Sequence, residues 1–262
     1  MLALDKRDGK QLWRAYTVAE PGHGAGIWSS VSVDLQLGLV YASTSNDDTG
    51  PTREPASAFH AFELATGSSR FSLHLEQDRA SLPVAFGANP VLYDVPVRGE
   101  TKPLMAGGAK SGQVYALDRR TGEMVWTNKH GPGSLDGDLG IFVNTAWTGT
   151  YVLVALNRNE GSEDSATLAA LDGATGALMW ERVPERKADV LGRITVANGV
   201  GFVGLADQLD VFDVDNGKLI KTVYTNGPTA LGTASIADGI VAFGTGVDSA
   251  VGSKLIVLEI ER

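Results

Sequence analysis

The sequence predicts an all-β fold, a β-propeller built from four-stranded blades. Three observations lead to this prediction: a strand–turn–strand motif recurs along the chain, two further strand-like runs lie between successive copies, and no segment sustains an amphipathic helical pattern between good caps. The 262 residues include 32 glycines, which suits a chain with many turns. We therefore expect one propeller domain over residues 1–262.

The recurring motif has the form Ala-Leu-Asp-x-x-Thr-Gly-x-x-x-Trp, and its clearest copy is ALDRRTGEMVW at residues 116–126. An alternating apolar run predicts the first strand, and Asp and Gly predict a tight turn in which glycine supplies a positive φ. The second strand ends on a large aromatic in four copies, which suits packing between neighbouring sheets. The six copies, of which the fifth is weaker and the last partial, begin at Ala3, Ala61, Ala116, Ala170, Val211 and Val257.

The remaining strands of each blade are expected between the copies of the motif. Residues 28–34 and 37–44 form one such pair of strand-like runs, and residues 192–199 and 199–206 form another. Two strands before the motif and two within it give four strands per repeat, and this is typical of propeller blades. A β-sandwich with coincidental repeats is the alternative, and the shared motif disfavours it.

The number of blades leaves two arrangements open. The chain starts on the third strand of a blade, completes four more blades near Tyr224 and continues with three strand-like runs, so we expect five to six blades. They could form a small closed ring sealed by strands from both termini, or part of a larger, eight-bladed ring that lacks its N-terminal blades. The start inside a blade and the lack of a signal-peptide pattern favour the larger ring.

Composition and charge exclude several classes of protein. A net charge of −9 argues against a nucleic-acid-binding face. The lack of cysteine excludes disulfides, thiolate metal sites and covalently attached haem c. No apolar run approaches the roughly 20 residues that span a bilayer. The four histidines show no metal-binding spacing, and we expect His60 to be packed or half exposed in a strand.

Two polar segments are predicted to be loops. Residues 131–140, GPGSLDGDLG, lack the ligand order of an EF-hand and are expected to form a long connection between blades. Residues 157–167, NRNEGSEDSAT, are expected to form a solvated loop because they are almost entirely polar.

The repeat consensus resembles the tryptophan-docking motif of quinoprotein propellers, which include the PQQ-dependent alcohol dehydrogenases. Residues 24–46 and 86–126 carry most of the resemblance, which is strongest to the polyvinyl-alcohol-dehydrogenase-like branch. It implies a periplasmic or secreted dehydrogenase that binds PQQ and Ca²⁺, oxidises small-molecule or polymeric alcohols and passes electrons to an unidentified acceptor. Propellers without a cofactor also carry this repeat. A binding or scaffold module is therefore the alternative, and whether the chain is an enzyme stays open.

The resemblance assigns roles to three residues of this chain. Trp28 matches the tryptophan that lies flat against the quinone, and its ordinary alternative is core packing. Lys110 matches the cation that contacts the quinone oxygens and could polarise a quinone carbonyl, and the alternative is a solvated turn lysine. Asn46, in a Thr-Ser-Asn triplet where the family has Thr-Gly-Asn, matches an amide ligand of Ca²⁺, and the alternative is an ordinary turn asparagine.

The family pattern fails at its catalytic carboxylate. The position of the family's catalytic Asp falls on Ser57, and serine cannot act as a carboxylate base. Asp47, Asp48 and Glu54 lie in the preceding loop as candidate substitutes, although solvated loop carboxylates are the simpler interpretation. The family's glutamate ligand for Ca²⁺ comes from an earlier blade that this sequence does not contain. We therefore expect a divalent cation to be held weakly.

Overall fold

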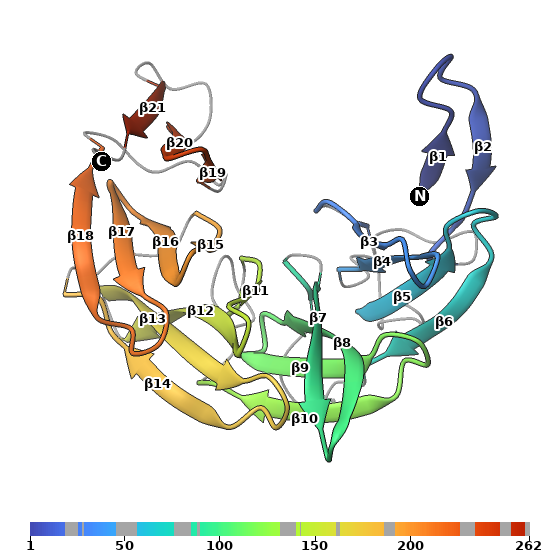
Figure 1. The fold of residues 1–262 in the computed structure, drawn as a ribbon, viewed down its shortest axis with the longest axis horizontal. Coiled ribbons are helices and arrows are strands. Elements are labelled where there is room, and N and C mark those ends of the chain that lie inside the picture. Colours follow the sequence, from blue (N-terminus) through green and yellow to red (C-terminus); the bar gives the residue numbers. More distant parts are fainter. Residues whose placement is uncertain are drawn as a thin grey trace. The chain divides into compact units, whose positions relative to one another are not determined.

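The computed structural model describes residues 1–18, 26–27, 29–45, 57–75, 85–87, 90–131, 140–141, 143–160, 163–185, 192–225, 234–246 and 253–259. Every helix or strand in these residues is a β-strand (Figure 1). The described part of the chain thus contains no helix that could cross a membrane. The chain divides into two compact units, Met1–Phe142 and Val143–Arg262.

In its described residues, the first unit holds a two-stranded hairpin and two four-stranded sheets. Each is an antiparallel meander, because strands that follow one another in the sequence are neighbours in the sheet. The strands are β1 (Leu2–Leu4) and β2 (Gln11–Arg14); β3 (Ser32–Asp34), β4 (Leu39–Ser43), β5 (Ala58–Glu63) and β6 (Ser69–His74); β7 (Val91–Val97), β8 (Glu100–Gly108), β9 (Gln113–Asp118) and β10 (Met124–Lys129).

The second unit follows the same plan, with two four-stranded meanders and one three-stranded sheet in its described residues. The strands are β11 (Ala146–Trp147), β12 (Tyr151–Glu160), β13 (Glu163–Asp172) and β14 (Leu178–Arg182); β15 (Thr195–Ala197), β16 (Val200–Leu205), β17 (Gln208–Asp213) and β18 (Leu219–Tyr224); β19 (Ser235–Ala237), β20 (Ile240–Thr245) and β21 (Lys254–Glu259). The predicted series of half a blade, four full blades and three further strands is confirmed.

The aromatic residue of the repeat docks onto the turn of the next blade. The indole nitrogen of Trp13 donates a hydrogen bond to the carbonyl of Leu64 at 3.0 Å. Its ring lies so close to Gly67 that a Cβ there would stand 2.5 Å from Trp13 Cε3. Trp180 makes the equivalent pair of contacts with the turn at Gly217. Glycine is therefore required twice at this turn, for its positive φ and for its lack of a side chain.

The aspartate of the repeat closes the same turn. Asp118 accepts a hydrogen bond from the Arg120 amide on its carboxylate at 2.9 Å, and its backbone carbonyl accepts one from the Gly122 amide at 2.8 Å. Gly122 has a φ of 79°. The Asp and Gly of the motif therefore build the hairpin, as the sequence predicts.

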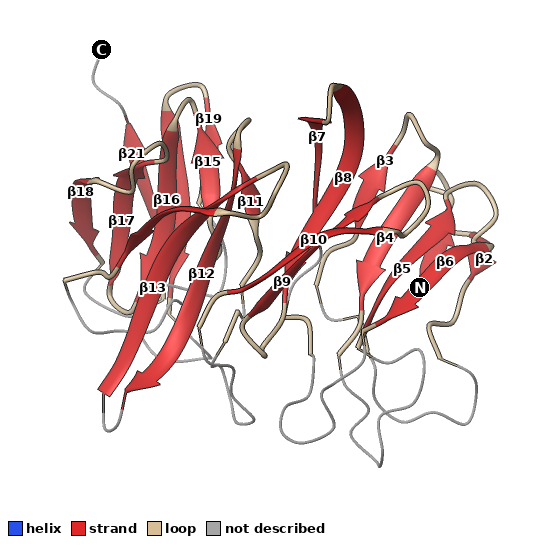
Figure 2. Cartoon of the chain, turned by 90° about the horizontal axis from the view of Figure 1, so that it is seen from below, coloured by secondary structure: helices blue, strands red, loops and turns tan. Residues whose placement is uncertain are grey.

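The prediction of a solvated loop at residues 157–167 is wrong. β12 and β13 pair without interruption from Tyr151↔Asp172 to Glu160↔Glu163, and Figure 2 shows them as one long hairpin. Asn157 is 2% exposed and Thr167 is 1% exposed. A backbone ladder can be formed by any residue with a free amide, so a polar composition does not prevent two strands in register from extending.

The core of the first unit lies between its two four-stranded sheets. Tyr41 and Phe59 come from the first sheet and Met105 and Leu117 from the second, and all four are almost completely buried. Phe86, from the connection between the sheets, packs against Phe59 with ring centroids 4.4 Å apart. This core fixes the two sheets of the unit against each other.

Candidate functional site

The two predicted site residues that the structure describes, Ser57 and Lys110, belong to chain connections at one end of the sheets in the first unit. In an antiparallel meander, successive connections alternate between the two ends. The β4–β5 and β8–β9 connections and the links into β3 and β7 therefore share an end, opposite to the β3–β4, β5–β6 and β7–β8 turns. We call this the connection end, and its described residues are 26–27, 44–45, 57, 85–86 and 109–112.

Several predicted residues cannot be placed. Trp28, Asn46, Asp47, Asp48 and Glu54 lie outside the described residues. Their roles stay predictions. The structure does describe the residues on either side of their segments, and it also describes Ser57 and Lys110.

Backbone hydrogen bonds join the segments that flank Trp28 and Asn46. The Ser45 amide donates to the Gly26 carbonyl at 3.2 Å, and the Ser57 amide donates to the Ser45 carbonyl at 2.9 Å. The Ser57 carbonyl in turn accepts from the Leu75 amide at 3.3 Å. The segment before β3 and both ends of the β4–β5 connection are thus held together.

Ser57 has an unusual conformation. Its φ is 51°, in the left-handed region that serine rarely adopts, and the residue is 0% exposed. Among the described residues, its hydroxyl is one of the few buried polar groups without a hydrogen-bond partner. The position that matches the family's carboxylate therefore holds a buried, neutral and unpaired hydroxyl.

The backbone of Lys110 is held from two sides. Its amide donates to the Ala85 carbonyl at 2.9 Å, and the neighbouring Ala109 carbonyl accepts from the Ile141 amide at 3.2 Å. Gly140, with a φ of 79°, lies directly against the Lys110 carbonyl, and a Cβ at this glycine would collide with it. The connections before β7 and after β10 thus fix the backbone position from which the Lys110 side chain extends.

An aromatic cluster connects the two sides of the connection end. Phe59, two residues after Ser57, packs against Phe86, which follows the Ala85 that binds Lys110. Phe86 also contacts the ring edge of Tyr115 with centroids 6.1 Å apart. The structure therefore brings Ser57 and Lys110, which are 53 positions apart in the sequence, to the same end of two sheets that share one core.

A buried polar group that the sequence analysis did not predict fixes the ends of β4 and β5. The hydroxyl of Thr44 accepts a hydrogen bond from the Ala58 amide at 3.1 Å and lies 3.2 Å from Nε2 of His60. Nδ1 of His60 lies 2.9 Å from the Ser72 hydroxyl. His60 is 1% exposed, so its packed alternative is confirmed. The pairing of β5 with β6, which sets Ser72 opposite His60, brings this group together and is not encoded in a local sequence pattern.

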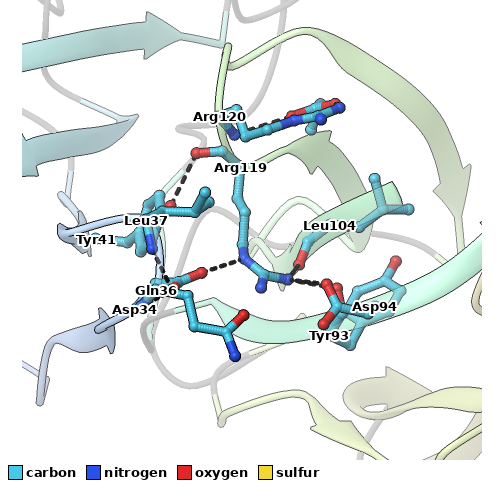
Figure 3. Close-up of polar contacts among 10 residues, drawn as sticks. Asp34, Gln36, Leu37, Tyr41, Tyr93, Asp94, Leu104, Arg119 and Arg120 are labelled. Atoms are coloured by element: carbon cyan, nitrogen blue, oxygen red, sulfur yellow. Dashed lines mark hydrogen bonds and ion pairs between the residues drawn. The ribbon is translucent and has the colours of Figure 1, made fainter. Parts of the chain in front are cut away.

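The most deeply buried ion pair of the first unit's described residues lies at the opposite end of the sheets (Figure 3). Arg119, just after β9, donates from Nε to Asp34 at 2.7 Å and from Nη1 to Asp94 at 2.9 Å. Nη1 also lies within hydrogen-bonding distance of the carbonyls of Tyr93 and Leu104. Since Asp34 belongs to one sheet and Asp94 to the next, this arginine joins the two blades.

The environment of this ion pair shifts two pKa values. Burial acts to raise the pKa of Asp34, but hydrogen bonds from the Leu37 amide and from Arg119, with the charge of Arg119, outweigh it and hold the pKa below its ordinary value. Burial raises the pKa of Tyr41, whose hydroxyl donates to the Arg119 carbonyl at 2.9 Å. Asp34, Tyr41 and Arg119 form hydrogen bonds with one another, so we assign these three residues a structural role.

The described part of the connection end contains the side chains of Lys110 and Ser57. Within the described ranges, no group of three or more His, Asp or Glu residues could hold a metal ion. Lysine and serine side chains are hydrogen-bond donors, and such donors suit a ligand that is rich in carbonyl and carboxylate oxygens.

Two family models match this chain, one over each half. A family model described as the β-propeller domain of glucose, ethanol and alcohol dehydrogenases matches residues 1–132. A second, described as outer membrane protein assembly factor BamB, matches residues 110–261. Polyvinylalcohol dehydrogenases from a Pseudomonas species and from Sphingopyxis sp. (strain 113P3) are 29% and 27% identical over 94% and 95% of this chain. The chain spans 45% and 44% of their lengths.

The same fold occurs in solved structures. The quinohemoprotein alcohol dehydrogenase ADHIIG from Pseudomonas putida HK5 superposes with a TM-score of 0.69 at 17% identity, covering 94% of this chain and 52% of that protein. This likeness concerns the fold, because the identity is low. The family model over residues 1–132, which covers half of the chain, shows that the chain belongs to the quinoprotein alcohol dehydrogenase-like β-propeller family.

Proposed function

We propose that this chain binds PQQ at the connection end of its first unit and takes part in alcohol oxidation of the polyvinyl-alcohol-dehydrogenase type. The observation that carries the proposal is the position of Lys110, which two connections hold at the end where Ser57 also lies. The similarity to polyvinylalcohol dehydrogenases over 94% of the chain supports the substrate class. The proposal includes a location outside the cytoplasm, in the periplasm or secreted.

The chain's own residues would bind and orient the quinone, which when bound supplies a two-electron acceptor for the alcohol. Lys110 would donate to the quinone oxygens, and its charge would draw electron density from a carbonyl. Trp28 would cover one face of the ring system. Phe59 and Phe86 would support the site from within the core, since they are buried against each other.

A base for the alcohol proton must come from elsewhere than residue 57. Serine stays neutral and does not accept that proton at ordinary pH. Asp47, Asp48 and Glu54 are the candidate bases, and Asn46 is the candidate amide ligand for Ca²⁺. Replacing each carboxylate by its amide, as in Asp47→Asn, Asp48→Asn and Glu54→Gln, tests them one at a time. The base is the one whose amide variant binds PQQ normally but loses turnover.

A binding or scaffold module is the second candidate function. The observation in its favour is the neutral Ser57 at the position of the family's carboxylate. The match of residues 110–261 to the BamB family model, whose name describes an assembly factor, also favours it. In that case the propeller would bind a protein, peptide or sugar without oxidising an alcohol.

The two functions are separated by reconstitution. The purified chain is incubated with PQQ and Ca²⁺, and reduction of an artificial electron-acceptor dye is followed with ethanol, a secondary alcohol and polyvinyl alcohol. The dehydrogenase proposal expects PQQ binding and alcohol-dependent dye reduction that Lys110→Ala abolishes. Failure to bind PQQ at high micromolar concentration contradicts it. PQQ binding without turnover, and unchanged binding in Trp28→Ala, would favour the binding module.

A further inference from the structure

Ser57 differs from the other described non-glycine residues that have a positive φ. Those four residues, Arg98, Asn198, Ala206 and Asp238, each lie in a two-residue turn between paired strands. Such hairpin turns require left-handed conformations, so the geometry explains those φ values. Ser57 directly precedes β5 at the end of a longer connection and lies in no such turn. Its conformation therefore needs another explanation.

The side chain of Ser57 also lowers the stability of the folded protein. Ser57 is 0% exposed, and its hydroxyl has no hydrogen-bond partner among the described residues. Its backbone is satisfied, because the amide donates to Ser45 and the carbonyl accepts from Leu75. Only the side-chain hydroxyl is left unpaired. A buried hydroxyl without a partner destabilises a fold, and alanine at this position would avoid that cost.

Strain and unpaired polar groups gather at sites where a ligand supplies the missing contact. We propose that the Ser57 hydroxyl contacts the bound quinone and donates a hydrogen bond to one of its carbonyl or carboxylate oxygens. This inference rests on the proposed function, since it takes PQQ to be the ligand of the connection end. Lys110 contributes a charged donor and Ser57 a neutral one, so the chain holds an oxygen-rich ligand from two elements.

The proposal predicts opposite effects of one substitution on stability and on binding. Ser57→Ala removes the unpaired hydroxyl, so the free protein should melt at a higher temperature than the wild type. The same variant loses one hydrogen bond to the ligand, so its affinity for PQQ should fall about 2- to 12-fold. Ser57→Gly, which also relieves the left-handed φ, should show both effects and serves as the second variant if alanine does not fold.

The experiment measures melting temperature without ligand and titrates PQQ against tryptophan fluorescence for each protein. Two matched controls separate the site from general effects. Ser165→Ala removes a serine that is 8% exposed in β13, and Asn198→Gly relieves a φ of 50° in a hairpin turn. Neither control should change PQQ affinity.

The experiment distinguishes four outcomes. Higher stability with weaker PQQ binding in both Ser57 variants supports the proposal. Unchanged PQQ affinity in both variants overturns it and leaves the proposed function intact. Lower melting temperatures in both variants overturn it as well, because the free protein would then not bear the cost of an unpaired hydroxyl from which the inference starts. A wild-type chain that does not bind PQQ overturns the proposed function and this inference together.

Discussion

Replacing Arg119 by methionine tests how the two sheets of the first unit are joined. The arginine side chain is 8% exposed and binds the carboxylates of Asp34 and Asp94 at 2.7 and 2.9 Å. Methionine keeps much of the side-chain volume but removes the charge and the donors. The Asp34 carboxylate, which is 6% exposed, would then stay buried with only backbone amides as partners.

The expected loss of stability is large because a buried charge is left without its counter-charge. Removing one partner of a buried pair costs about 3–5 kcal/mol. Asp94, by contrast, is 54% exposed, so its share of the ion pair is screened by solvent. Asp94→Asn should therefore cost less than about 1 kcal/mol. Most of the effect of Arg119→Met should come from the contact with Asp34.

Urea unfolding followed by tryptophan fluorescence measures the effect. Arg70→Met is the control, because that arginine is 57% exposed and lies 3.6 Å from a partly exposed Glu63. It should lower the free energy of unfolding by less than about 1 kcal/mol. If Arg119→Met also costs less than about 1 kcal/mol, the buried ion pair does not hold the sheets together and the reasoning is refuted.

The pH dependence of the unfolding free energy provides a second measurement of the same ion pair. The pKa of Asp34 is lowered in the folded protein, so its ionised form contributes stability above the ordinary carboxyl pKa of about 4. That stability is lost as the pH falls through the folded pKa. The difference in unfolding free energy between wild type and Arg119→Met should therefore be full at pH 7 and shrink as the pH falls below about 4. A constant difference would contradict the assignment.

Two further predictions concern glycines. Gly217→Ala would place a Cβ 2.7 Å from the Trp180 ring, whereas Gly239→Ala, at a similar φ, meets no atom within 4 Å. Thermal unfolding should show Gly217→Ala to be the more destabilising by about 1–3 kcal/mol, and equal effects would refute the docking of the aromatic. Gly140→Ala should displace the Lys110 backbone and weaken PQQ binding about tenfold or more. Circular dichroism checks that the variant is folded, and unchanged affinity would contradict the role of this connection.

The blade architecture could be predicted because its determinants are local and repeated. The Asp and Gly of each motif close a hairpin within a few residues, as Asp118 and Gly122 do. The aromatic at its end meets the next turn at a fixed spacing. The segment at 157–167 could not be predicted in the same way, since its strands depend on pairing with each other rather than on their composition.

The site could be predicted only in part. The resemblance to the quinoprotein family identified Lys110, and it identified Ser57 as the position where serine replaces the family's aspartate. The structure places both residues at one end of the first unit. No sequence pattern indicates that Ser57 has a left-handed φ or that its hydroxyl is unpaired, because both depend on contacts with distant segments. The ion pair of Arg119 with Asp34 joins residues 85 positions apart, and only the packing of the two sheets reveals it.

The most direct test of a quinone site at the connection end is a PQQ titration of the wild type beside Lys110→Ala and Lys110→Arg. Loss of a charged hydrogen bond should weaken binding about tenfold or more in Lys110→Ala, while Lys110→Arg, which keeps the charge, should retain part of the affinity. The melting temperatures of the ligand-free proteins should stay close together. Equal PQQ affinity in all three proteins, or no binding by the wild type, would contradict the proposed function.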